Sequence, residues 1–545
     1  MNERVLDVVK HKWENCGGGV AALPRRADFE IPEVEWPERP EGEFATPDRI
    51  AEYEVAKEES VRRFRYARKL SQHNSDLHSL RCGTTLKLDQ AEELREEREI
   101  YFPFNVDFRG RVYPIPAHLN HMGDDLSRGL LTFSEKRPLG ERGLRWLKVQ
   151  LANVYGEDKC SFEDRVEFVN QNLDHVRASA ERPNEYGWWL DADKPWQALA
   201  ACIEINDAMN HSGDSLDTFM SNLPVHQDGS CNGLQHYAAL GRDRRGGAKV
   251  NLTSGDRPAD VYAGVLDIVK EKVQAHLRGE DSAGETEVVG TNGMTQQQVA
   301  GLVYDHLVRK TIKQTVMTTV YGVTFVGAKQ QIYSQLRHLT EPGAVLEHVG
   351  DDVIYGASGY LAKLTLSSQG ELFANANRMK EWLTTAADEV AKCGQPISWM
   401  TPMGLPVVQP YRHSTKHRVK THMQDVTIAV SDDELPVSKP RQKSAFPPNF
   451  VHSLDSTHMM MTALECHRRG LTYTAVHDSY WTHASSVDDM NEVLREEFVV
   501  LHSQPLLEQL RSSLVLRYPQ ASFPSVPVPG DLDLTEVYDS EYFFN

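Results

Sequence analysis

The segment LPVHQDGSCNGLQHYAAL, at residues 223–240, constrains the fold more than any other part of the chain. Its apolar start predicts a short strand, and its second half predicts a helix. Gly229 and Gly233 permit a sharp reversal between the two, and Ser230 or Asn232 can cap the helix. Asp228 then stands at the end of the strand, where its carboxylate can face a cleft. An ordinary turn aspartate fits the Asp-Gly pair as well, whereas the GxSxG turn of a hydrolase does not match the spacing.

A second carboxylate lies in LTYTAVHDSYWTHA, at residues 471–484. Two short β-type runs flank His477, Asp478 and Ser479, which predicts a hairpin with Asp478 at its tip. Aspartate and serine are common in turns, and a Ser-His-Asp triad is a poor fit because neighbours on one hairpin do not converge. Two exposed carboxylates from distant segments suit a pair of magnesium ions, because magnesium takes oxygen ligands. In two-metal sites the two ions lie about 3.5–4 Å apart.

Residues 305–322, DHLVRKTIKQTVMTTVYG, predict a basic helix that stops at a glycine. At about 100° per residue, one stripe of this helix holds Arg309, Lys313, Val316 and Val320. Met317 and Tyr321 lie on the edge of that stripe. Like charges at i and i+4 repel by roughly 0.2–0.5 kcal/mol, and an anion across Arg309 and Lys313 removes that cost. A nucleoside triphosphate is the natural candidate, and a solvated basic face is the simpler alternative.

Composition leaves the partner open. The formal net charge of -19 argues against nucleic acid if it is spread over the whole surface, but a basic channel can lie inside an acidic exterior. Candidates for such a lining are the clusters Arg109/Arg111, Arg242/Arg244/Arg245, Arg309/Lys310/Lys313 and Lys416/Arg418/Lys420. No apolar run approaches the roughly 20 residues of a membrane-spanning helix, so no membrane partner is predicted. The seven cysteines form no CxxC pair, which favours neither a zinc site nor disulfides.

The pattern along the chain predicts an α/β or α+β protein with a long helical insertion, and not an alternating parallel barrel. Strand-like alternation occurs in YFPFNVDFRGRVYPI at 101–115. The predicted helical regions are 59–99, 138–221, 298–336 and 371–393, and the predicted loops are 276–297 and 421–448.

Taken together, these segments resemble the bacteriophage-type single-subunit RNA polymerases, and the mitochondrial branch most of all. The resemblance runs from about residue 100 to the end of the chain and more weakly through residues 1–100. Seven ordered blocks carry it: DFRGRVYPIPAHLNHMG at 107–123, RGLLTF at 128–133, DGSCNGLQH at 228–236, RKTIKQTVMTTVYG at 309–322, PPNFVHSLDSTHM at 447–459, HDSYW at 477–481 and SEYFFN at 540–545.

The resemblance implies a mostly helical α+β fold with the thumb, palm and fingers of a right-hand polymerase. It places a thumb-like part at 1–97, the palm at 98–244 and 453–545, and the fingers at 245–452. It implies RNA synthesis without a primer by a monomer that takes a DNA template and ribonucleoside triphosphates and releases an RNA product. Transcription initiation factors and a mitochondrial location are further implications.

Site roles follow from the same resemblance. Asp228 and Asp478 would bind two Mg²⁺ ions, with the Gly229 carbonyl as a further ligand. Arg309 and Lys313 would hold the incoming triphosphate, and Lys313 would protonate the departing pyrophosphate. Most of the rate would come from positioning and charge neutralisation.

The remaining assignments concern the nucleotide and the nucleic acid. Tyr321 would sit beside the insertion site and favour a ribonucleotide, next to Met317 and Gly322 on the same helix. Arg109 and Arg111 would steady the template and hybrid backbones, and His452 would touch the sugar edge of the paired bases. The C-terminal carboxylate, after Phe544, would lie near the active site.

Full-length relatives carry an N-terminal region for promoter contact and strand opening, whereas this chain starts near the thumb. Elongation chemistry can survive that loss, and specific initiation is the activity it puts in question. The region 421–446, where the family places a promoter-reading loop, shows no motif that aligns securely. Three alternatives stay open: a DNA polymerase with the same palm, a non-catalytic nucleic-acid-binding remnant, and a generic two-metal hydrolase.

Overall fold

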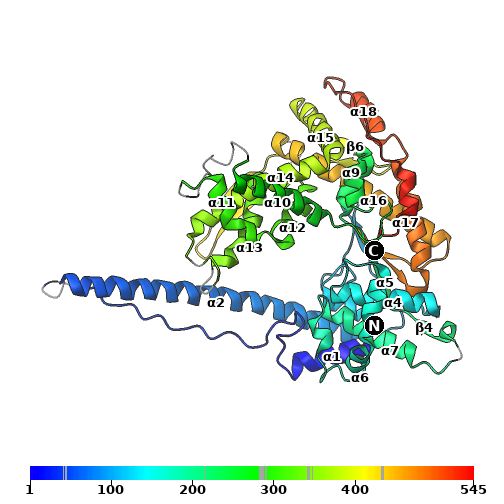
Figure 1. Cartoon of the computed structure of the whole chain (residues 1–545), viewed down its shortest axis with the longest axis horizontal. Helices are drawn as coiled ribbons and strands as arrows, with labels where there is room; N and C mark the ends of the chain where they lie inside the picture. The colour runs from blue at the N-terminus through cyan, green and yellow to red at the C-terminus, as the bar shows by residue number, and fades with distance from the viewer. Residues whose placement is uncertain are drawn as a thin grey trace.

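The computed structural model describes residues 1–545 except positions 41, 43–45, 214, 281–287, 289, 290, 292, 341–343, 347 and 431–434. One element dominates its outline: the helix α2, Pro47–Glu93, extends far from the rest of the chain (Figure 1). Proline in its first turn suits a helix start, where the missing N–H is no loss. The segment before α2 runs back along it, because Asn74 exchanges two 2.8 Å hydrogen bonds with the backbone of Phe29. Within the described residues, no helix combines the length and apolar character that a membrane crossing requires.

A first hydrophobic core lies at the base of α2. Buried residues such as Trp146, Trp189 and Trp196 fill it. The helices that surround it are α1 (Glu3–Glu14), α3 (Asp125–Leu130), α4 (Gly140–Tyr155), α5 (Phe162–Gln171), α6 (Leu173–Glu181) and α7 (Pro195–Met209). The predicted helical character of 138–221 is confirmed.

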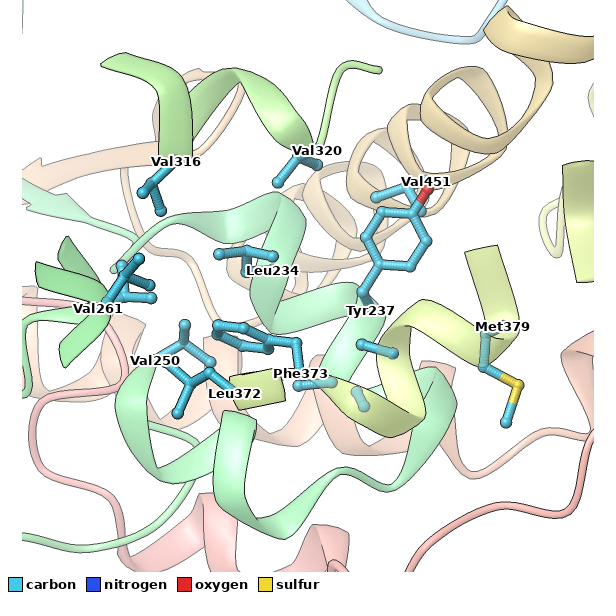
Figure 2. Packing of buried hydrophobic residues seen from close by; sticks show 14 of the residues in the cluster. Leu234, Tyr237, Val250, Val261, Val316, Val320, Leu372, Phe373, Met379 and Val451 are labelled. Atoms are coloured by element: carbon cyan, nitrogen blue, oxygen red, sulfur yellow. The ribbon is translucent and has the colours of Figure 1, made fainter. Parts of the chain in front are cut away.

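A second, larger core joins the middle of the chain to its C-terminal part. Figure 2 shows Leu234 and Tyr237 at its centre, with Val316, Val320 and Phe373 packed around them. Its helices are α8 (Asn232–Gly241), α9 (Arg244–Lys249), α10 (Val261–Arg278), α11 (Gln296–Val303), α12 (Arg309–Thr319), α13 (Phe325–Leu336), α14 (Asp351–Leu372), α15 (Ala374–Lys392), α16 (Lys439–Arg468), α17 (Val487–His502) and α18 (Leu506–Arg517).

A three-stranded antiparallel sheet lies between the two cores. Its strands are β5 (Pro224–Asp228), β10 (Thr474–Val476) and β11 (Ser479–His483), in the order β10-β11-β5. The predicted hairpin around Asp478 is therefore confirmed. The central strand β11 is fully buried, in keeping with the aromatic and β-branched residues Tyr480, Trp481 and Thr482.

The remaining strands form two-stranded antiparallel pairs. They are β1 (Phe104–Val106) with β2 (Val112–Pro114), β3 (Arg137–Pro138) with β4 (Met220–Ser221), β6 (Ser398–Met400) with β7 (Pro406–Val408), and β8 (Thr415–Lys420) with β9 (Asp425–Val430). The first pair confirms the strand-like pattern at 101–115.

Two predictions about elements are wrong. The expected loop at 421–448 holds the strand β9 and the first turns of α16, apart from 431–434, which lie outside the described residues. The helix α14 begins twenty residues before the predicted helical region at 371–393. Glycine and β-branched residues lower the helix propensity of α14, and burial of residues such as Ile354 and Leu361 overrides it. The overall pattern is the predicted one, a mostly helical α+β fold.

Candidate active site

The sheet brings the two predicted carboxylates together. Asp228 is the last residue of β5 and lies directly opposite Ser479, the first residue of β11. Asp478 precedes that serine, and its carbonyl accepts a 2.9 Å hydrogen bond from the Gly229 N–H. His477 adopts φ +54°, a left-handed turn conformation that directs the chain back into β11. Two carboxylates from segments about 250 residues apart in sequence therefore share one edge of a rigid sheet.

The end of the chain lies against the same edge. Asn545 pairs with Asp228 through two backbone hydrogen bonds, 3.1 Å from its N–H and 3.2 Å to its carbonyl. The fully buried guanidinium of Arg165 donates to the Asn545 side chain at 3.2 Å. The predicted approach of the C-terminus to the candidate active site agrees with this geometry, and Figure 1 shows the C-terminus between the upper and lower groups of helices.

The turn after Asp228 differs from the prediction. The left-handed residue is Cys231, at φ +71°, and neither Ser230 nor Asn232 caps α8. The Asn232 amide instead donates to the buried carboxylate of Asp455 at 2.5 Å. Gly233 is required for close packing and not for a reversal, since a Cβ there would lie 2.3 Å from the side chain of Val320, the residue that follows α12.

The helix α12 and Asp478 line a common cavity of about 270 Å³. Arg309 donates to Asp260 at 2.5 Å, and its guanidinium lies 4.9 Å from the centre of the Tyr262 ring. The Lys313 ammonium lies 5.9 Å from the same ring and has no hydrogen bond or ion pair within the described part of the chain. Lys313 is thus a cation available to a ligand.

The predicted stripe on α12 divides between two environments. Val316 and Val320 point into the hydrophobic core, as Figure 2 shows, and are 0% and 3% exposed. Met317 and Tyr321 are 39% and 46% exposed and line the cavity with Arg309 and Lys313. Gly322, at φ +78°, ends the turn that follows the helix, where a β-carbon would be strained.

A second cavity of about 200 Å³ adjoins the turn that follows Asp228. Asp228 lines this second cavity, Asp478 lines the first, and Lys159, Gly229, Ser230 and Asn545 line both. Lys194 also lines the second cavity. Sequence reasoning missed both lysines, because neither belongs to a spaced motif and only the packing of α4, α7 and β5 brings them to the site.

Electrostatics at the site favours a bound cation. Burial raises the pKa of the Asp478 carboxyl to about 7, and the negative charges of Asp455 and Asp228 act in the same direction. A divalent cation beside Asp228 and Asp478 relieves this repulsion. Within the described residues no three His, Cys, Asp or Glu side chains form a metal-binding group. Two carboxylates and the Gly229 carbonyl suit magnesium, which takes its remaining ligands from water and substrate phosphates.

The predicted nucleic-acid contacts form an internal network. Arg111 pairs with the buried Asp455 at 2.5 Å, and Arg109 pairs with Asp107 at 2.7 Å. Arg109 also donates to the His452 ring nitrogen Nδ1 at 3.0 Å. Burial, with the nearby arginines, lowers the pKa of His452 to about 2, so its ring is neutral and accepts this bond.

This network adjoins the nucleotide cavity, because the His452 ring lies 5.1 Å from the Tyr321 ring. Its Nε2 atom has no hydrogen-bond partner within the described residues and is buried. Asp455, which sequence reasoning missed, lies within the block at 447–459, and the spacing to His452 places both on one stretch of α16. Whether Arg109, Arg111 and His452 contact nucleic acid stays a prediction.

Comparison with known proteins gives a consistent family. A family model described as DNA-dependent RNA polymerase matches residues 137–523, more than half of the chain. "DNA-directed RNA polymerase 1, mitochondrial" of Nicotiana sylvestris is 46% identical over 553 residues, covering 100% of this chain and 51% of the relative. "DNA-directed RNA polymerase 3, chloroplastic" of the same plant is 46% identical, covering 100% and 52%.

A third relative, "DNA-directed RNA polymerase 2, chloroplastic/mitochondrial" of Arabidopsis thaliana, is 44% identical and covers 100% of this chain and 50% of its own length. This chain spans about half the length of the curated relatives it matches. The matched family model and the identity along the whole chain agree with the seven sequence blocks, and the chain belongs to the DNA-dependent RNA polymerase family in its bacteriophage-type single-subunit form.

Proposed function

We propose that this chain carries the catalytic centre for DNA-templated RNA synthesis from ribonucleoside triphosphates by two-magnesium nucleotidyl transfer. One observation carries the proposal. The pairing of β5 with β11 sets Asp228 beside Asp478, and Lys313, which has no hydrogen bond or ion pair within the described residues, lines the same cavity as Asp478. Family membership supports the reaction class, since the relatives are named DNA-directed RNA polymerases.

The carboxylates and the polypeptide backbone would hold the metal ions. Asp228, Asp478 and the Gly229 carbonyl are the proposed ligands. Magnesium bound there activates the attacking RNA hydroxyl and neutralises charge on the transferring phosphate. The sheet keeps the two carboxylates at a constant separation, so little reorganisation is needed when substrate arrives.

The residues of α12 would bind the nucleotide. Arg309 and Lys313 hold the triphosphate, with Lys159 on the opposite wall of the cavity. Lys313 gives a proton to the departing pyrophosphate, and within the part of the chain that the structure describes no carboxylate forms an ion pair with its ammonium. Tyr321 lies beside the sugar, with Met317 one turn earlier on the same wall.

The protein's broader setting is proposed from its relatives. DNA template, RNA product and ribonucleoside triphosphates are the proposed partners, with initiation factors and a monomeric state as further proposals. The relatives are named as mitochondrial, chloroplastic or both, and we propose a mitochondrial location for this chain. The division into thumb (1–97), palm (98–244 and 453–545) and fingers (245–452) is likewise proposed. The long helix α2 and the segment beside it supply the thumb in this division.

The test is extension of an RNA annealed to a DNA template, with magnesium and ribonucleotides, in an assembled scaffold that bypasses initiation. We expect templated extension by the wild-type chain and its loss, by about 10³-fold or more, in Asp228→Asn and Asp478→Asn. Scaffold binding should persist in both variants. Asp489→Asn, an exposed carboxylate on α17, is the matched control and should retain activity.

The outcomes separate the alternatives. Extension by either active-site variant at the wild-type rate contradicts the two-metal assignment. Tight scaffold binding without extension by the wild-type chain favours a non-catalytic remnant. Preferential use of deoxyribonucleotides favours a DNA polymerase with the same palm.

A further inference from the structure

A lysine from a neighbouring helix contacts the end of the helix that carries the nucleotide-binding residues. Lys380, on α15, donates to the backbone carbonyl of Thr319, the last residue of α12, at 3.0 Å. This is its one hydrogen bond within the described residues, and it forms no ion pair there. Lys380 is partly buried, and this burial lowers the pKa of its ammonium. The Thr319 carbonyl is the acceptor that the structure gives to this partly desolvated group.

The contact fits the needs of a helix terminus. The last four carbonyls of a helix lack intrahelical partners and carry partial negative charge. On α12, Thr319 O accepts from Gly322 N at 3.1 Å as well as from Lys380, and Thr318 O accepts from Tyr321 N at 3.0 Å. The turn that holds Tyr321 is thus hydrogen-bonded to the same two carbonyls that end the helix.

A second side chain reaches the same end of α12 from another helix. Gln369, on α14, donates to the carbonyl of Val316 at 3.4 Å. Together, Gln369 and Lys380 supply hydrogen-bond donors from neighbouring helices to backbone carbonyls near the C-terminus of α12. No basic residue of α12 itself lies in its last turn, so Lys380 supplies from α15 a charge that complements the helix dipole.

The base of Lys380 is anchored in the core. The carboxylate of Asp243 accepts hydrogen bonds from Asn375 N and Ala376 N, at 2.9 and 3.3 Å, and so fixes the start of α15. Met379, the residue before Lys380, is fully buried, and Figure 2 shows it in the core cluster that also contains Tyr237 of α8. Because the backbone of Lys380 is fixed and its ammonium has one acceptor, the Thr319 carbonyl, the side chain is suited to hold that carbonyl in place.

We propose that Lys380 is a positioning residue for nucleotide selection, which holds the end of α12 so that Tyr321 faces the incoming nucleotide. The proposal rests on the proposed function. Tyr321 lies two residues beyond the carbonyl that Lys380 binds, and its ring lines the nucleotide cavity 5.1 Å from His452. Displacement of the Thr319 carbonyl displaces this turn, and with it the wall beside the sugar.

The test replaces the ammonium with a side chain of similar length. In Lys380→Met we expect amide hydrogen exchange at Tyr321, Gly322 and Val323 to accelerate by about 5- to 30-fold, the range for losing a partly buried cation at a helix C-terminus. We expect the preference for ribonucleotides over deoxyribonucleotides to fall by a similar factor, mainly through a raised ribonucleotide KM. Lys380→Gln keeps a hydrogen-bond donor without the charge. Its exchange rates and its ribonucleotide preference should lie between those of the wild-type chain and those of Lys380→Met.

Lys392→Met is the control, since Lys392 is an exposed lysine at the far end of α15 that pairs with Asp388 and Glu389. It should match the wild-type chain in both measurements. Wild-type exchange and wild-type sugar preference in Lys380→Met overturn the proposal. The exchange measurement needs no activity, so if the wild-type chain fails to extend RNA, the proposed function fails while amide protection at 321–323 still decides whether Lys380 holds the end of α12.

Discussion

At the scale of single residues, the unusual group is the Asp478 carboxyl. Its pKa of about 7 exceeds the value of about 4 expected in an unfolded chain. Between these two pH values the native state binds more protons than the unfolded state, so this residue's contribution to the stability of the metal-free protein falls as pH rises. The causes are burial and the negative charges of Asp455 and Asp228.

Asp478→Asn should therefore stabilise the metal-free protein, and more so at high pH. We expect its advantage in unfolding free energy over the wild-type chain to grow by about 1–3 kcal/mol from about pH 5 to about pH 8. Urea unfolding in EDTA measures this. Saturating magnesium should stabilise the wild-type chain and leave the variant nearly unchanged. A pH-independent difference between the two chains would contradict the raised pKa.

Tyr321 supplies a second residue-scale prediction. Tyr321→Phe removes the hydroxyl and retains the ring packing against His452, so the fold should be unaffected. We expect the ribonucleotide preference to drop by about tenfold, the effect of one lost hydrogen bond of 1–1.5 kcal/mol. Single-nucleotide incorporation with matched ribo- and deoxyribonucleotides measures it. Met317→Leu, on the same wall, should leave the preference unchanged, and unchanged discrimination in Tyr321→Phe would remove Tyr321 from sugar selection.

At the scale of elements, one ion pair ties the long helix α2 to the first core. The buried Lys87 donates to both carboxylate oxygens of Asp124, which also caps α3 through Ser127 N. Burial by itself raises the pKa of Asp124, but the Lys87 ammonium and the Ser127 N–H outweigh it, and the pKa is lowered. The stabilisation from this ion pair is therefore fully present above the pKa that Asp124 has in the unfolded chain. It is lost as the pH falls through the lower pKa that Asp124 has in the folded protein.

Lys87→Met should lower the unfolding free energy by about 1 kcal/mol at neutral pH, a modest value because the Asp124 side chain is 61% exposed and screened by solvent. The deficit should shrink as the pH falls below about 4, the pKa of aspartate in an unfolded chain, because the native Asp124 carboxyl has a lowered pKa and takes up its proton at lower pH. Denaturant titrations across this range test it. Lys57→Met breaks an exposed pair with Glu54 on the same helix and should cost no more than about 0.5 kcal/mol.

At the scale of the whole molecule, the C-terminal end of the chain returns to the site formed by β5 and β11. The terminal Asn545 pairs with Asp228 and lines both cavities, and Phe544 before it is buried against Tyr480 of β11. A removable tag fused after Asn545 should reduce scaffold extension by about 10- to 100-fold, as expected when a catalytic group is displaced. Proteolytic removal of the tag should restore extension. The same tag before Met1 should have little effect, and full activity with the C-terminal tag in place would argue against a role for this pairing.

The charge distribution also makes sense only for the whole molecule. A formal net charge of -19 coexists with cavities that gather Lys159, Lys194, Arg309 and Lys313 around the two carboxylates. Other predicted basic clusters serve the fold, since Arg244 pairs with Glu536 and Arg242 donates to the His502 carbonyl. Lys416, Arg418 and Lys420 lie on the exposed β8.

The sequence by itself determined the local placement of the main residues. Asp228 ends a strand, Asp478 lies at a hairpin, and Arg309, Lys313 and Tyr321 belong to one basic helix and the turn that follows it. Each of these features depends on neighbours within a few positions, where side-chain periodicity and turn preferences act directly. The seven blocks added the family, and through it the mostly helical right-hand fold.

Only the tertiary structure decided which distant segments meet. The pairing of β5 with β11, the return of Asn545 to Asp228, the Arg111–Asp455 pair and the reach of Lys380 to Thr319 all join residues that lie far apart in the sequence. The side of α12 that faces the core was settled in the same way, by the space beside Gly233. Such contacts arise from packing two cores around one sheet, and close packing depends on the shapes of all partners at once, which no local pattern records.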